Sequence, residues 1–234
     1  MFLGSQHRTW RSNIANSSTI FRWPRWSAIV VTVVLAACAV VAVRALRDAA
    51  LRAAGWALVV NEPVAPADII VLSVDSGPAG ALEAADLVHR GIAKRVAVFT
   101  DPPSEDDEQF IRRGLPYDDE GARQIRRLRL LGVTDVVEIS RVSGTEDEGQ
   151  VLPAWCDAHK FRSIVFVATK DHTRRLRRIL DRAMKGHPTR VTVHAAHYSG
   201  FDPDQWWKSR LGVRIEIVEF EKLLLDIVLH PMSS

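Results

Sequence analysis

The stretch that decides the fold of this chain reads Ser163-Ile-Val-Phe-Val-Ala-Thr169-Lys-Asp-His172-Thr-Arg-Arg175. Residues 164–168 are apolar and mostly β-branched, which is typical of a strand buried between two layers of helices. Polar residues follow at once, and then a helical pattern. A ligand outside the carboxyl end of this strand would meet Thr169, Lys170 and His172 first, with backbone amides of the helix favouring an anion. The stretch therefore predicts where a site lies in an α/β fold, but it names no reaction.

The rest of the globular sequence repeats this order of strand and helix. We expect strands at residues 68–74, 94–100, 134–139, 163–169 and 190–195. Helical patterns lie near 80–90, 117–131, 146–160, 172–185 and 213–229. A βα repeat with right-handed crossovers predicts a Rossmann-like, mainly parallel five-stranded sheet with helices on both faces. The acidic run at 105–108 is expected to be an exposed loop.

The composition is that of an ordinary globular protein with a basic amino-terminal segment. The 234 residues are 47% hydrophobic and 25% charged, with a formal net charge of +3. Residues 1–44 hold five arginines and no acid, and removing these from the 31 basic residues leaves 26 against 28 acidic ones. Nucleic acid is therefore not an expected partner. Cys38 and Cys156 lie far apart, so we expect neither a disulfide framework nor a cysteine metal site.

An uncharged segment of eighteen residues lies between Arg25 and Arg44. It is long enough to cross a bilayer, and Trp23 and Trp26 stand at one end, where aromatic rings prefer the headgroup layer. A buried core helix and a cleaved signal peptide are the alternatives. The first would lack a polar face, and the second would place Arg44 inside the cleavage motif, so we favour a retained anchor. Charge alone favours an amino terminus inside the cell only weakly, because arginines flank both ends.

These features divide the chain into four parts. We expect a short basic cytoplasmic segment at residues 1–25, a transmembrane helix in the lipid bilayer at 26–44, a linker at 45–66 and an α/β domain at 67–230. The last helix of that domain follows Trp206-Trp207 and is more apolar than a surface helix requires. We expect it to pack against the sheet, with contact to the bilayer as the alternative.

Polar residues follow every expected strand, at the edge where parallel sheets bind ligands. Asp75 comes after the first strand, and Glu148 lies in the first turn of the helix after the third. Thr145 fits both a helix cap and a ligand contact, because threonine followed three residues later by an acid is typical of a helix start. Arg175 lies one turn into the helix after the fourth strand and can reach back to an anion, although arginine-rich runs are usually solvated helix faces.

The sequence identifies no cofactor. The loop after the first strand lacks the GxGxxG spacing, and neither a Walker A loop nor a GxSxG nucleophile elbow occurs. His194 and His197 would point to opposite faces of the last strand, so we expect no metal site there.

Eight pieces of the chain occur in an order that carries a family resemblance. They are Ala67-Asp68-Ile-Ile-Val-Leu72, Glu83-Ala-Ala-Asp-Leu-Val-His-Arg-Gly91, Glu120-Gly-Ala, Leu131-Gly-Val133, Thr145-Glu-Asp-Glu148, Thr169-Lys-Asp-His172-Thr-Arg-Arg175, Trp206-Trp207 and Glu219-Phe-Glu-Lys222-Leu. This series resembles the SanA/YdcF/ElyC-like family of bacterial envelope proteins, which is known as a domain of unknown function. The resemblance covers roughly residues 66–229.

The resemblance implies functional roles for Thr145, Glu148, His172, Arg175 and Glu120. It also implies a single-pass protein of the plasma membrane with its globular domain outside the cytoplasm. The chain departs from the family in three places. The first loop reads Ser73-Val-Asp75-Ser-Gly77 where the family has glycines, the family's arginine at the start of the next helix is absent, and Gly144 stands where the family has asparagine. Glycines let a backbone approach a phosphate or a sugar closely, so the site of this chain could be degenerate.

Two functions are compatible with these residues. The first is a membrane-anchored envelope protein that binds or processes an anionic small molecule, a phosphorylated or glycosylated cell-envelope precursor. His172 would act as acid or base, oriented by Glu120 or Glu148, and Arg175 would hold an anionic group. The other expected ligand contacts are Asp75, Thr145, Thr169 and Lys170. The second function is a non-catalytic, membrane-tethered scaffold or regulator of envelope biogenesis.

Overall fold

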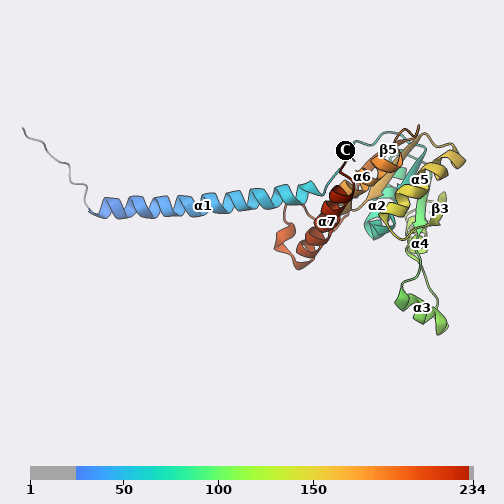
Figure 1. The fold of residues 1–234 in the computed structure, drawn as a ribbon, viewed down its shortest axis with the longest axis horizontal. Coiled ribbons are helices and arrows are strands. Elements are labelled where there is room, and N and C mark those ends of the chain that lie inside the picture. Colours follow the sequence, from blue (N-terminus) through green and yellow to red (C-terminus); the bar gives the residue numbers. More distant parts are fainter. Residues whose placement is uncertain (1–24, 232–234) are drawn as a thin grey trace, which may run out of the picture. The chain divides into compact units, whose positions relative to one another are not determined.

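The computed structural model describes residues 25–231, apart from the side chains of residues 25, 27 and 28. It divides into two compact units, Met1–Arg47 (the N-terminal unit) and Asp48–Ser234 (the C-terminal unit). Figure 1 shows the elements in chain order. The basic segment expected at residues 1–25 lies outside the described residues, except for its last residue.

Helix α1 (Arg25–Ala57) contains the apolar segment. The stretch Ile29–Ala57 is long and apolar enough to span a membrane, and none of its most apolar window is buried. The sequence predicts a linker from residue 45, whereas the helix continues to Ala57. The reason is local: residues 45–54 are rich in alanine, leucine and arginine, which are strong helix formers, and the first proline after the apolar run is Pro63.

The C-terminal unit is built on a five-stranded sheet in which every pairing is parallel, as the sequence predicts. The strands are β1 (Ile69–Leu72), β2 (Val96–Thr100), β3 (Val136–Arg141), β4 (Ser163–Ala168) and β5 (Arg190–Ala195). Their order across the sheet is β3-β2-β1-β4-β5. The central strand β1 pairs with β2 through Ile70 opposite Val96, and with β4 through Ile70 opposite Val165. The strand order therefore reverses between β1 and β4, where such folds form a ligand crevice.

Helices cover both faces of this sheet, which confirms the predicted fold class. They are α2 (Gly77–His89), α4 (Glu120–Leu130), α5 (Thr145–His159), α6 (Thr173–Ala183) and α7 (Arg210–Leu229). Leu152 of α5 and Leu176 of α6 share one buried core with Phe166 of β4. Leu87 of α2 and Leu128 of α4 belong to a second core. Alternate residues of β1 enter the two cores, because successive side chains of a strand point to opposite faces.

Helix α3 (Glu105–Arg112) lies where the sequence predicts an exposed loop. Its residues are not buried, so no apolar stripe indicates a helix. A capping box forms it instead: the side chain of Ser104 accepts from the backbone N–H of Asp107, and the carboxylate of Asp107 accepts from the backbone N–H of Ser104. The prediction of a loop was therefore wrong because it weighed charge and not capping.

Gly121→Ala is expected to lower the free energy of unfolding by about 1–3 kcal/mol. A Cβ atom at this position would lie 2.6 Å from the carbonyl oxygen of Phe99, so the backbone of α4 or β2 would have to move. Thermal unfolding of the full chain in detergent measures the change. Gly200→Ala is the matched control, because no described atom lies within 4 Å of a Cβ there. Equal unfolding temperatures for the two variants would contradict the close packing of α4 on β2.

Candidate functional site

His172 and Thr145 lie in contact at the carboxyl edge of the sheet. The chain leaves β4 into a single 3₁₀ turn, Lys170–His172, and Thr145 is the first residue of α5. The hydroxyl oxygen Oγ1 of Thr145 lies 2.9 Å from Nε2 of His172, and both residues are buried. Two residues that the sequence predicts for the site are therefore hydrogen-bonded to each other.

Glu219 of α7 lies against the other nitrogen of the same imidazole ring. Its Oε2 atom is 3.3 Å from Nδ1 of His172. Thr145, His172 and Glu219 thus form a chain of hydroxyl, imidazole and carboxylate. In this connectivity a carboxylate orients a histidine and the histidine activates a hydroxyl.

The sequence predicts that Glu120 or Glu148 orients His172, whereas the carboxylate that lies against its Nδ1 atom in the structure is that of Glu219. The physical reason is tertiary. Helix α7 turns its acidic residues inward against α6 and the turn that carries His172, so a residue 47 positions away reaches the ring.

Arg175 restricts the hydrogen bonds that the imidazole ring of His172 can make. Its Nη2 atom lies 3.0 Å from Nδ1 of His172 and 3.3 Å from Oε2 of Glu219. A guanidinium group only donates, so Nδ1 either accepts from Arg175 or donates to Glu219. When Nδ1 carries the proton, Nε2 accepts the hydroxyl proton of Thr145. When Nε2 carries it, the ring donates to Thr145 and cannot act as its base.

Glu219 is held as a carboxylate. Burial acts to raise its pKa, but the hydrogen bond and charge of His172, together with Lys222 and Arg175, outweigh burial and lower the pKa to about 2. Lys222 contributes through a contact of 2.6 Å from Nζ to Oε1. A fixed negative charge beside Nδ1 favours the tautomer in which Nδ1–H donates to Glu219.

Four of the five arginines of α6 lie in partly buried ion pairs, and the fifth, Arg174, is exposed and donates to backbone carbonyl groups. The side chain of Arg175 is only 13% exposed, and its charge is matched by Glu219. Arg178 Nε lies 2.6 Å from a carboxylate oxygen of Asp226, and Arg182 pairs with the other oxygen. In this structure Arg175 pairs with an anion that α7 supplies from within the protein, and its predicted contact with an anionic ligand stays a prediction.

Glu148 is completely buried beside the loop that follows β1. Its Oε1 accepts from the backbone N–H of Val74 at 2.6 Å, and its Oε2 accepts from the hydroxyl of Ser73 at 3.2 Å. Burial raises the pKa of Glu148 to about 7, and the contacts of Val74, His172 and Ser73 offset only part of this effect. A carboxyl group with this pKa exchanges its proton near neutral pH, which is a property of acid–base residues.

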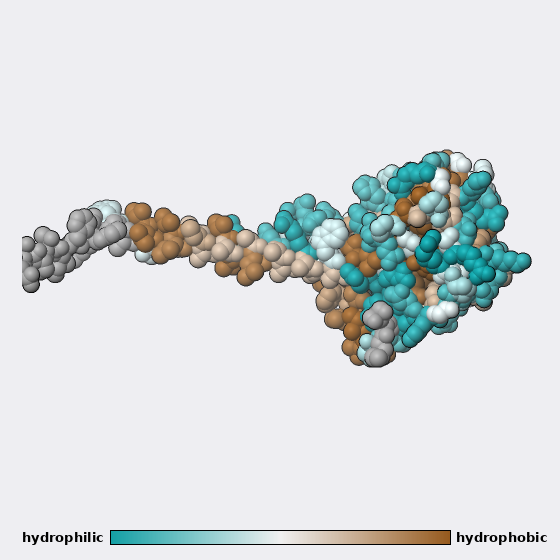
Figure 2. All heavy atoms as spheres, turned by 90° about the horizontal axis from the view of Figure 1, so that it is seen from above, coloured by the Kyte–Doolittle hydropathy of each residue, from teal (hydrophilic) through white to brown (hydrophobic). Residues whose placement is uncertain are grey.

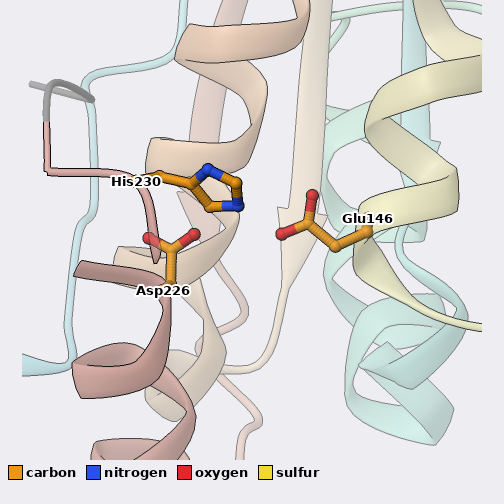
Figure 3. A group of neighbouring side chains, drawn as sticks. All are labelled: Glu146, Asp226 and His230. Carbon is orange, nitrogen blue, oxygen red and sulfur yellow. The ribbon is translucent and has the colours of Figure 1, made fainter. Parts of the chain in front are cut away.

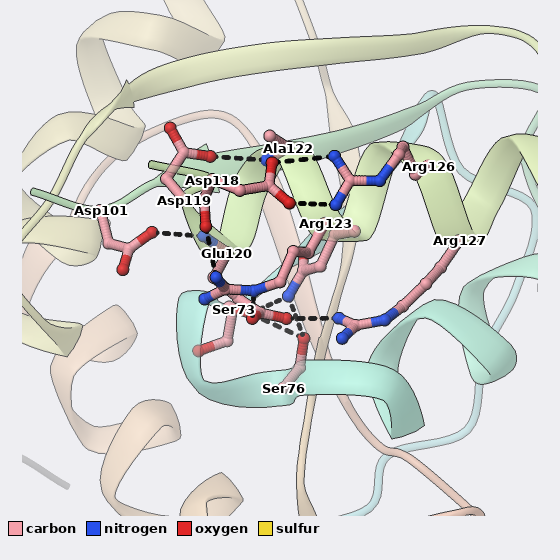
Figure 4. A network of polar contacts seen from close by, with 11 residues as sticks. Ser73, Ser76, Asp101, Asp118, Asp119, Glu120, Ala122, Arg123, Arg126 and Arg127 are labelled. Carbon is pink, nitrogen blue, oxygen red and sulfur yellow. Dashed lines mark hydrogen bonds and ion pairs between the residues drawn. The ribbon is translucent and has the colours of Figure 1, made fainter. Parts of the chain in front are cut away.

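Glu120 belongs to a network on the other side of the crevice, shown in Figure 4. Its carboxylate contacts Arg123 at 2.8 Å and Arg127 at 2.6 Å, and its backbone N–H donates to Asp101. The carboxylate is thus committed to arginines of its own helix. Glu120 does not orient His172, but it lines a neighbouring cavity.

This cavity, which we call the β1–β3 cavity, lies at the carboxyl ends of β1, β2 and β3 and has a volume of about 440 Å³. It is lined by Val74, Asp75, Gly77, Asp101, Pro102, Glu120, Val142 and Ser143. Glu148 binds the backbone of Val74, and Ser143 precedes Thr145 by two residues. Glu148 therefore lies directly behind the wall of this cavity, and Asp75 lies in it as a ligand contact could.

Thr169 and Lys170 are separated from that cavity. The carbonyl oxygen of Thr169 accepts from the backbone N–H of His172, so this residue shapes the turn. Lys170 lines a different cavity of about 470 Å³, together with His194 and His197. The structure therefore distributes the predicted site residues over three places: the His172 cluster, the β1–β3 cavity and this second cavity.

Among the residues that the structure describes, one group of side chains has ligand atoms close enough to hold a metal ion. These are Glu146, Asp226 and His230, whose ligand atoms lie within 4.8 Å of one another (Figure 3). Arg182 already bridges two of them, at 2.9 Å from Glu146 and 2.8 Å from Asp226. A divalent cation would meet this guanidinium at close range, so the group is better explained as ion pairs that join α5, α6 and α7.

Glu219 is the residue that sequence reasoning missed, although a signal was present. Glu216, Glu219, Leu223 and Asp226 recur at spacings of three and four, and the structure buries all of them. A stripe of acids at helical period within an apolar helix indicates a polar partner on that face, here the arginines of α6.

No family model matches this chain, and no curated protein is significantly similar to it.

Proposed function

We propose that this chain is a membrane-anchored envelope protein of the SanA/YdcF/ElyC-like kind that binds or processes a glycosylated cell-envelope precursor. The observation that carries the proposal is the hydrogen-bonded chain of Thr145, His172 and Glu219 at the same edge of the sheet as the β1–β3 cavity, whose wall residue Val74 is hydrogen-bonded to Glu148. The ordered resemblance of residues 66–229 supports the family, and the apolar helix α1 supports the anchor. By the same resemblance, the C-terminal unit lies outside the cytoplasm.

The lining of the β1–β3 cavity favours a sugar over a bare phosphate. Its described lining residues include the carboxyl groups of Asp75 and Asp101, the hydroxyl of Ser143, and Glu120, whose carboxylate is already paired with arginines of α4; none of the lining residues is cationic. Carboxylates accept hydrogen bonds from sugar hydroxyls and repel phosphate oxygens. The glycosyl part of a precursor is therefore the part that this cavity holds, and any phosphate group lies outside it.

In the acid–base role, Glu219 would keep the proton on Nδ1 of His172, and Nε2 would accept the proton of Thr145. Glu148 would exchange a second proton through the Ser73 hydroxyl, with which it shares a hydrogen bond. Burial of these groups strengthens each polar contact, because the local dielectric constant is low.

Asp75→Asn is expected to weaken binding of sugar-bearing probes roughly tenfold, the effect of losing one charge-assisted hydrogen bond. The measurement is titration of the full chain in lipid nanodiscs with a nucleotide sugar, with the same nucleotide lacking the sugar, and with inorganic phosphate. We expect saturable binding of the first probe only. Glu138→Gln, which changes an exposed carboxylate on β3, is the matched control. Equal binding of all probes, or no effect of Asp75→Asn, would overturn the sugar assignment.

The acid–base role has a separate test in the same preparation. Thr145→Val removes the hydroxyl at constant shape, and Thr145→Ser restores it. We measure whether the protein converts the nucleotide-sugar probe into a product. Conversion that is lost in Thr145→Val and kept in Thr145→Ser supports proton transfer from Thr145 to His172. Binding without turnover in the wild type would support the second candidate instead.

That second candidate is a tethered scaffold that binds without catalysis. It is favoured by one observation: His172, Thr145 and Glu148 are at most 4% exposed, so a ligand in the cavity meets them only through the cavity wall.

A further inference from the structure

Helix α7 is built with its polar and apolar faces reversed relative to an ordinary surface helix. Its buried positions are Gly212, Glu216, Glu219, Leu223 and Asp226, of which three are acids. These acids face α6 and the His172 turn, where Arg175, Arg178 and Arg182 neutralise Glu219 and Asp226. The inward face of α7 is therefore largely a charged seam. Leu223 on the same face belongs to a small buried core with Ala195 of β5, so α7 packs against the sheet there, as its apolar composition predicts.

Most apolar residues of α7 point outward as a consequence, whereas Leu223 is buried and Val213 and Ile215 are half-buried. Those that the structure exposes are Leu211, Ile217, Val218, Phe220, Leu224, Leu225, Ile227, Val228 and Leu229. Figure 2 shows brown, hydrophobic areas on a C-terminal unit whose surface is otherwise largely hydrophilic. Scattered single apolar residues are normal on a surface, but nine on one helix form a patch that indicates a binding face.

Cationic and aromatic side chains adjoin this face at its amino-terminal end. Trp207, Lys208, Arg210 and Arg214 surround an open hollow of about 400 Å³. Acidic side chains are scarce on the exposed surface of α7, where Glu221 is the one that the described residues provide. Leucine and aromatic residues beside lysine and arginine are the composition of helices that lie in the headgroup layer of an anionic membrane.

The chain also keeps this face near a bilayer. Trp206, four residues before the first residue of α7, donates from Nε1 to the carbonyl oxygen of Leu51 at 2.7 Å. Leu51 lies seven residues after Arg44, the first charge past the apolar run. Seven residues span at most about 25 Å even when fully extended, so the attachment point of α7 cannot leave the vicinity of the membrane that α1 enters.

We propose that the outward face of α7, with Lys208, Arg210 and Arg214 at its end, binds the surface of a bilayer that contains anionic lipid. The proposal requires α1 to span that bilayer and is independent of the ligand proposed for the β1–β3 cavity. A second copy of the chain fits this face less well, because it would bring the same cations and few exposed acids to pair with them.

The test is photo-cross-linking of the full chain in liposomes of phosphatidylcholine and phosphatidylglycerol. The photoreactive residue p-benzoylphenylalanine replaces Leu225 of α7, Val33 of α1 as the positive control, or Leu130 of α4 as the matched negative control. Leu130 is exposed to 88%, but it is not part of the α7 face. Mass spectrometry identifies lipid adducts, and gel electrophoresis identifies cross-linked dimers.

We expect several-fold more lipid adduct at position 225 than at position 130. The double variant Lys208→Gln with Arg210→Gln should reduce this adduct several-fold, whereas Lys94→Gln with Lys185→Gln, two exposed cations elsewhere, should not. Lipid adduct at Val33 but not at Leu225, or dimers at Leu225, would overturn the proposal. Absence of adduct at Val33 would overturn the membrane span and the proposal with it, and would leave the sugar-binding test unaffected.

Discussion

Glu219→Ala is expected to destabilise the protein by about 3–5 kcal/mol, the usual result of removing one partner of a buried ion pair. Glu219 contacts His172, Arg175 and Lys222, and the side chain of Arg175 is only 13% exposed. Without the carboxylate, the guanidinium of Arg175 would remain largely buried beside the imidazole with no anion near it. Thermal unfolding of the full chain in detergent at neutral pH measures the loss.

Two variants separate charge from packing in this prediction. Glu219→Gln keeps the size and one acceptor oxygen, so it should lose less than the alanine variant. Glu221→Ala removes an exposed acid two residues away on the same helix and should change stability little.

The sign of the pH dependence is fixed by the low pKa of Glu219. Its stabilisation is fully present above pH 4.5, the unperturbed value, and is lost as the pH falls from 4.5 towards 2. The difference between wild type and Glu219→Gln should therefore shrink in that window. The prediction is contradicted if the difference in stability between wild type and Glu219→Gln stays constant down to pH 2. It is also contradicted if Glu219→Ala does not lower stability, because the charge of Glu219 would then not stabilise the cluster of His172, Arg175 and Lys222.

The sheet was predictable because burial on both faces leaves a local signal. Four- to six-residue runs such as Ile69–Leu72 and Ser163–Ala168 are β-branched and apolar, and polar residues bound them. No other element explains such runs at that length, so strand positions follow from the sequence alone. Helix α3 carries no such run, and only its capping box distinguishes it from a loop.

Part of the candidate site was predictable for a related reason. Thr145 and His172 directly follow strands, and parallel strands bring their carboxyl ends to one edge of the sheet. Glu219 follows no strand, and its position depends on which face α7 turns inward. That choice is made by ion pairs with α6, such as Arg178 with Asp226, which the spacing of single residues does not specify.

Glu148→Gln is expected to stabilise the protein at pH 8 by on the order of 3 kcal/mol and to leave stability nearly unchanged at pH 4. Burial raises the pKa of Glu148 from 4.5 to about 7. Below pH 4.5 the carboxyl is protonated in both the folded and the unfolded state and contributes no difference. Between pH 4.5 and 7 the folded protein keeps a proton that the unfolded chain has released, so stability falls as the pH rises. Above pH 7 the cost of the buried charge is complete.

Glutamine fits this position because the neighbouring groups can satisfy it. Its carbonyl oxygen can accept from the backbone N–H of Val74, and its amide can donate to the hydroxyl oxygen of Ser73, which rotates. The measurement is the unfolding temperature of both proteins at intervals from pH 4 to pH 8. Glu216, whose pKa burial also raises to about 7, adds to the trend in each protein and cancels in their difference.

Glu138→Gln supplies the control, because this exposed carboxylate should give a difference from wild type that is small at every pH. A stabilisation by Glu148→Gln that does not grow between pH 4.5 and 7 would show that Glu148 does not carry a proton at neutral pH. The acid–base role behind the β1–β3 cavity would then rest on His172 alone. If the stabilisation grows as expected, the protein keeps a buried, protonatable carboxyl at Glu148 at a cost in stability above pH 4.5. Such a cost in stability is typical of groups kept for chemistry rather than for folding.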